Sequence, residues 1–70
     1  MKYIYLFEII SDALEFERKL KKLEIDMKLI PTPRKYSASC SICALVSEKN
    51  VEQIEKIFKN KKFEKFPYDN

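Results

Sequence analysis

The chain has 70 residues, 46% of them hydrophobic, with a formal net charge of +3, two cysteines, no histidine and no glycine. This length predicts one domain over residues 1–70 and excludes a second core. The lack of histidine excludes Ser-His and Cys-His catalysis and histidine metal sites, and so small a net charge does not indicate a nucleic acid partner.

The first part of the chain predicts a strand, a helix and a second strand. Residues Tyr3 to Ile9 are aromatic and β-branched, which is typical of a strand. Ser11 and Asp12 provide N-cap residues for a helix that ends near Leu23. A short strand over residues 27–30 follows. The apolar residues of the helix recur at helical spacing: Ala13, Phe16, Leu20 and Leu23.

The second part predicts a strand, a helix and an edge strand. The strand runs from Ser41 to Val46, and Asn50 with Gln53 has the spacing of a capping box. The final strand, over residues 63–66, is expected to end at Pro67. The apolar stripe of the second helix consists of Val51, Ile54, Ile57 and Phe58. Without glycine, the natural candidates for positive φ are Asp26, Asn50 and Asn60.

The order βαββαβ predicts an α+β fold, a ferredoxin-like sandwich with an antiparallel sheet and two helices on one face. Right-handed crossovers place the first and third strands in the middle. The open face is then expected to show Tyr3, Tyr5, Phe7 and Cys43. This apolar area predicts a homo-oligomer, most simply a two-fold dimer through that face.

Cys40 and Cys43 form a Cys-x-x-Cys motif with three interpretations. A zinc site needs four thiolates, which only a dimer could supply. A redox disulfide is difficult in a strand, because the two Cα atoms would lie about 10 Å apart, whereas a disulfide needs roughly 4.4–6.8 Å. In the third interpretation Cys40 alone is the working thiol, and Arg34 and Lys35 favour its thiolate. Cys43 is then a core residue or a resolving thiol.

The segment that carries the motif resembles a known family. Pro31, Pro33, Arg34, Ser37, Ser39 and Cys40 match the most specific stretch of the selenium/sulfur (Se/S) carrier-like family of small bacterial proteins. The resemblance implies a thiol that carries sulfur or selenium. It departs at Ser41, and at Glu24 or Ile25, because the family usually has glycine at these two places.

We therefore expect a persulfide or selenide carrier, loaded at Cys40 by a cysteine desulfurase or a selenium-delivering enzyme. The chain has too few catalytic groups for a self-sufficient enzyme, and no cofactor, metal, nucleic acid or membrane is expected. Two cysteines without a secretory or transmembrane segment indicate the reducing cytoplasm. The alternatives are a non-catalytic interaction or regulatory module that dimerises through the open face, or a thiol redox protein.

Overall fold

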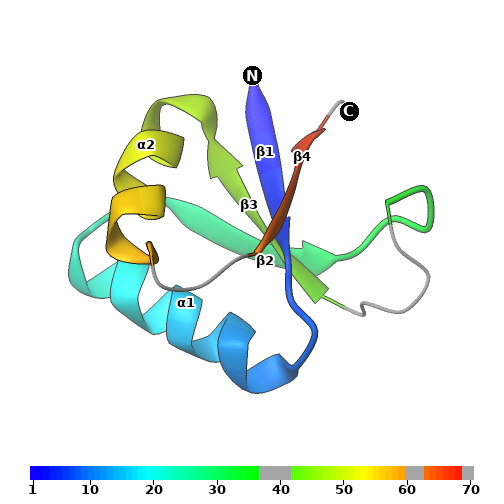
Figure 1. Ribbon diagram of the computed structural model, residues 1–70, viewed down its shortest axis with the longest axis horizontal. Helices are drawn as coiled ribbons and strands as arrows, with labels where there is room; N and C mark the ends of the chain where they lie inside the picture. Colours follow the sequence, from blue (N-terminus) through cyan, green and yellow to red (C-terminus); the bar gives the residue numbers. More distant parts are fainter. Residues whose placement is uncertain (37–41, 60–62, 69–70) are drawn as a thin grey trace.

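A computed structural model describes residues 1–36, 42–59 and 63–68 (Figure 1). In chain order the elements are β1 (Lys2–Leu6), α1 (Ile10–Lys22), β2 (Met27–Pro31), β3 (Ile42–Ser47), α2 (Glu48–Ile57) and β4 (Glu64–Tyr68). Within these residues the strands form one antiparallel sheet in the order β2-β3-β1-β4. The order and pairing confirm the predicted ferredoxin-like α+β arrangement, with β1 and β3 in the middle.

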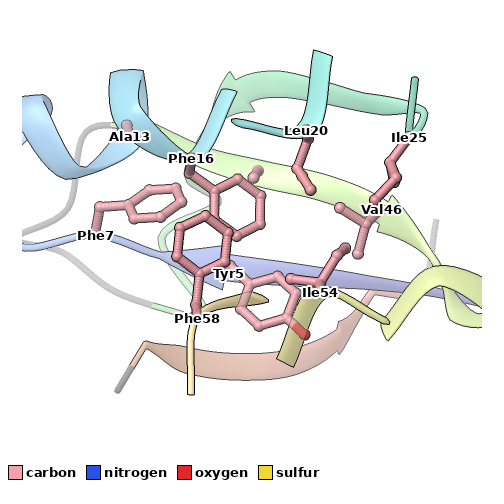
Figure 2. Packing of buried hydrophobic residues seen from close by; sticks show 10 residues of the cluster. Tyr5, Phe7, Ala13, Phe16, Leu20, Ile25, Val46, Ile54 and Phe58 are labelled. Carbon is pink, nitrogen blue, oxygen red and sulfur yellow. The ribbon is translucent and has the colours of Figure 1, made fainter. Parts of the chain in front are cut away.

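The main core lies between the sheet and the two helices, and Phe16 of α1 is at its centre. Its ring contacts Tyr5 and Phe7 at centroid distances of 5.4 and 5.2 Å, and it stacks on Phe58 at 5.0 Å. Figure 2 shows these rings converging from β1, α1 and the end of α2. Burial of aromatic area of this size is the main stabilising contribution available to a chain so short.

The prediction that Tyr3, Tyr5 and Phe7 lie on the open face is wrong. Tyr5 and Phe7 are buried under the helices, and Tyr3 packs against the same cluster. The register explains this placement, because Tyr5 is opposite Ala44 and neighbouring residues of paired strands share a face. The first strand is apolar on both sides, so its sequence did not determine which side would meet the helices.

The open face has a small core of its own. Ile4, Leu6 and Cys43 are buried there. The partly buried residues packed against them are Ile30, Tyr36, Leu45, Phe66 and Tyr68. Of the residues predicted for this face, only Cys43 lies on it.

Both helices begin earlier than predicted. Ile9 is the N-cap of α1 and Ser47 that of α2, and neither cap residue makes a side-chain capping hydrogen bond. At α2 the backbone N–H of Glu48 instead donates to the carbonyl of Met1 at 3.0 Å. A tertiary contact thus replaces the capping box predicted at Asn50, which lies inside the first turn.

The ends of the strands also differ from the predictions. β1 ends at Leu6 rather than Ile9, and Phe7, just beyond its end, is still buried in the main core. β4 continues through Pro67, which pairs with Tyr3. A proline is tolerated there because β4 is an edge strand, and a missing N–H costs no ladder bond on its outer side.

The apolar stripes of the helices are largely as predicted. Ala13, Phe16 and Leu20 of α1 are buried, as are Ile54 of α2 and Phe58 at its end. Leu23 is the exception, with 50% of its surface exposed. It is the C-cap residue, where the backbone has already left helical geometry.

The end of α1 is a Schellman motif built without glycine. The N–H of Ile25 donates to the carbonyl of Leu20 at 2.9 Å, and that of Glu24 donates to Lys21 at 3.1 Å. Glu24 has φ of 58°, the only positive φ in the described part of the chain. The candidates Asp26 and Asn50 are therefore wrong, and Asn60 lies outside the described residues.

We expect Glu24→Gly to stabilise the fold by about 0.5–1 kcal/mol. A left-handed conformation costs a residue with a Cβ about 1–2 kcal/mol, and the greater unfolded-state entropy of glycine offsets roughly half of that gain. Urea unfolding measures the difference. Glu24→Ala is the matched control, since it removes the same charge and keeps the Cβ. A glycine variant no more stable than the alanine variant would contradict the prediction.

Candidate functional site

The connection after β2 begins with a tight turn that presents two cations to solvent. The backbone N–H of Tyr36 donates to the carbonyl of Pro33 at 3.1 Å. This bond closes a β-turn over residues 33–36. Its middle residues, Arg34 and Lys35, are both exposed. The structure therefore brings these two predicted site residues together at the tip of one turn.

Cys40, the predicted carrier thiol, lies outside the described residues, as do Ser37, Ser39 and Ser41. In sequence it follows Tyr36 by four residues and precedes the start of β3 by two. The described residues on either side of it are therefore the turn over residues 33–36 and the first residue of β3, Ile42.

Tyr36 anchors the turn on the far edge of the sheet, and sequence reasoning missed it. Its hydroxyl donates a 3.1 Å hydrogen bond to the carbonyl of Pro67 in β4. The centroid of the Tyr36 ring lies 5.7 Å from that of Phe66 and 6.3 Å from that of Tyr68. Lys35 Nζ lies 5.1 Å from the centroid of the Tyr36 ring. The only signal in the sequence was an aromatic residue inside a polar run.

Cys43 is placed in the middle of the sheet. It lies in β3, pairs with Leu6 of β1 and Ile30 of β2, and has 0% of its surface exposed. Its burial agrees with the interpretation that it is a core residue. A resolving role for Cys43 would first require the residues that pack against this small core to move away.

A second polar group lies on the helix side, at the edge formed by β4 and α2. The Tyr5 hydroxyl donates to Glu55 Oε2 at 3.4 Å, and Lys65 Nζ donates to the same oxygen. Lys65 Nζ also lies 5.4 Å from the ring centroid of Tyr3. A half-open groove of about 390 Å³ adjoins this group. Its lining residues are Tyr5, Ile54, Glu55, Phe58, Lys59, Phe63 and Lys65.

The environment shifts two pKa values in this group. Burial raises the pKa of Tyr5 well above its usual value, and the nearby Glu55 carboxylate raises it further. The hydrogen bond from Lys65 lowers the pKa of Glu55. Tyr5 is therefore a neutral hydrogen-bond donor at physiological pH, and Glu55 is an ionised acceptor.

Tyr5 should make the protein less stable in alkali. Its pKa is higher in the folded state than in the unfolded state, so its contribution is complete below about pH 10 and declines as the pH rises. The slope for one such group is at most about 1.4 kcal/mol per pH unit. In Tyr5→Phe, the free energy of unfolding should fall less steeply between pH 10 and 11.5. Denaturant titrations at several pH values measure this slope, and equal slopes in both proteins would exclude the effect.

The described part of the chain contains no helix with the length and apolar character of a membrane span.

The comparisons with known proteins give one positive result. No curated protein and no solved structure matches the chain significantly. The model of the family described as "Putative Se/S carrier protein-like" matches residues 2–66. Because this match covers nearly the whole chain and includes the segment from the β2 end through Cys40, the chain belongs to that family.

Proposed function

We propose that this chain carries sulfur or selenium on Cys40, as a persulfide or its selenium analogue. The observation that supports this most is the complete burial of Cys43. The chain has two cysteines, so in the folded protein an accessible thiol has to be Cys40. Membership of the carrier-like family supports the kind of cargo.

Loading is a transfer between sulfur atoms without net oxidation. The Cys40 thiolate attacks the outer sulfur of a donor persulfide, R–S–SH, and a new S–S bond forms. The S–S bond of the donor breaks, its electron pair leaves on the inner sulfur, and the donor remains as a thiolate, R–S⁻. A selenium donor, R–S–SeH, reacts in the same way. The attacking species is the thiolate, so a lower pKa increases the reactive fraction at neutral pH.

Arg34 and Lys35 are the groups we assign to thiolate stabilisation. Both are exposed cations in the turn that leads to the cysteine, and Arg34 precedes Cys40 by six positions in sequence. A cation close to a partly desolvated thiol favours its anion. Guanidinium has a planar set of donors and is always charged, so Arg34 is expected to contribute more than Lys35.

The proposal implies an external donor and acceptor, because neither of the two described sites provides the groups to release sulfur from a substrate. A cysteine desulfurase or a selenium-delivering enzyme in the cytosol is the expected donor. A homo-oligomer stays a prediction. Its original basis is gone, since the aromatic residues of β1 face the helices.

Our first test concerns which thiol reacts and what it carries. Iodoacetamide should label Cys40 at least tenfold faster than Cys43 in the folded protein, and the two rates should converge in denaturant. Tandem mass spectrometry assigns the label to each cysteine. The same method, applied to protein isolated from its host without reductant, should find one extra sulfur or selenium atom on Cys40. Faster labelling of Cys43 would reverse the two roles.

The second test concerns Arg34. Removing a cation that lowers the thiol pKa by about one to three units should raise the midpoint of the alkylation pH–rate profile of Cys40 by a similar amount in Arg34→Ala. Lys35→Ala is the matched control and should move the midpoint less. Both substitutions are at exposed positions, so unfolding free energies should change by less than about 0.5 kcal/mol. An unmoved midpoint in Arg34→Ala would exclude its role in activation.

A further inference from the structure

Tyr36 connects the two opposite edges of the sheet. It follows β2, which lies at one edge, and its hydroxyl binds the carbonyl of Pro67 in β4, which lies at the other. Its side chain packs over the small core of Ile4, Leu6 and Cys43 on the way. In Figure 1 the segment that follows β2 lies on the side of the sheet opposite α1 and α2, and the Tyr36 side chain reaches from it to β4.

The same residue also determines the shape of the turn that carries the cations. Its N–H closes the turn on Pro33, and its ring faces Lys35 Nζ at 5.1 Å. Arg34 and Lys35 are both exposed, and the described contact of Lys35 Nζ is with the Tyr36 ring. The turn that carries both cations is thus held by the ring and hydroxyl of Tyr36, which are bound to β4.

We propose that Tyr36 is a positioning residue for the thiol chemistry, acting through Arg34 and Lys35. This inference rests on the proposed carrier function of Cys40. It assigns to β4 a role that its sequence does not suggest, because the carbonyl of Pro67 and the ring of Phe66 fix the turn from the far edge of the sheet. A purely structural Tyr36 would support the fold and leave the reactivity of the thiol unchanged.

Other charges on this face are few among the described residues. By register, Lys2, Lys28 and Glu64 are on the open face of the strands. The turn itself adds Arg34 and Lys35. If substitution of Tyr36 changes the midpoint of the alkylation pH–rate profile of Cys40, that change is therefore compared first with the change in Arg34→Ala.

The test uses the alkylation pH–rate profile of Cys40 in a Cys43→Ala background, where one thiol reports. Tyr36→Phe keeps the ring and removes the hydrogen bond to Pro67, and it should raise the midpoint by a few tenths of a pH unit. Tyr36→Ala removes the hydroxyl, the ring packing on β4 and the contact with Lys35, and its midpoint should approach that of Arg34→Ala. Tyr68→Phe is the matched control, because it removes a hydroxyl from the same aromatic group, and its midpoint should stay that of the parent.

A double variant separates positioning from general loosening. If Tyr36 acts through Arg34, then Arg34→Ala/Tyr36→Ala should have nearly the midpoint of Arg34→Ala alone, and the two shifts should not add. Additive shifts would overturn the inference. Folded Tyr36→Phe and Tyr36→Ala variants with unmoved midpoints would also overturn the inference. In that case a shifted midpoint in Arg34→Ala would still leave the proposed function standing. A parent midpoint at about 8.5, the ordinary value for cysteine, unmoved in Arg34→Ala, would overturn this inference and the activating role of Arg34. The carrier role of Cys40 would instead be overturned by faster labelling of Cys43.

Discussion

The pairing of Tyr5 with Ala44 across β1 and β3 is the constraint on which the rest of the structure depends. It places a large residue beside a small one at the centre of the sheet, on the face that meets the helices. Phe16 of α1 packs there against Tyr5, and Phe58 stacks on Phe16 from the end of α2. A shift of register by one residue would turn the aromatic side of β1 away from both helices.

This register leaves a second apolar surface that also has to be covered. Ile4, Leu6 and Cys43 face away from the helices, and burying them requires something from the rest of the chain. Tyr36 provides part of that cover, together with apolar residues of β2, β3 and β4. The segment that leads to the cysteine motif is therefore part of the fold as well as the support for two exposed cations. A change in its anchoring affects stability and the proposed site together.

The chain ends α1 without glycine, the residue best suited to the left-handed position there. Glu24 adopts the left-handed conformation that closes α1, where glycine would carry no Cβ penalty. Ile25 next to it packs into the main core beside Leu20, as Figure 2 shows. The strain at Glu24 is tolerated because the hydrogen bonds of the motif and the burial of Ile25 offset it.

The order of elements, the fold class and the apolar stripes followed from the sequence alone. These features depend on periods of two and 3.6 residues, which are local, and Ala13, Phe16 and Leu20 show such a period clearly. The composition of the segment before Cys40, with two prolines and two cations, also made it the candidate site. The face taken by Tyr5 and the role of Tyr36 were decided only by the tertiary structure. Both sides of β1 are apolar, so only pairing with β3 chose between them, and Tyr36 meets a carbonyl 31 residues further along the chain. No local pattern encodes a contact of that kind, because it exists only once the sheet has brought β4 beside β1.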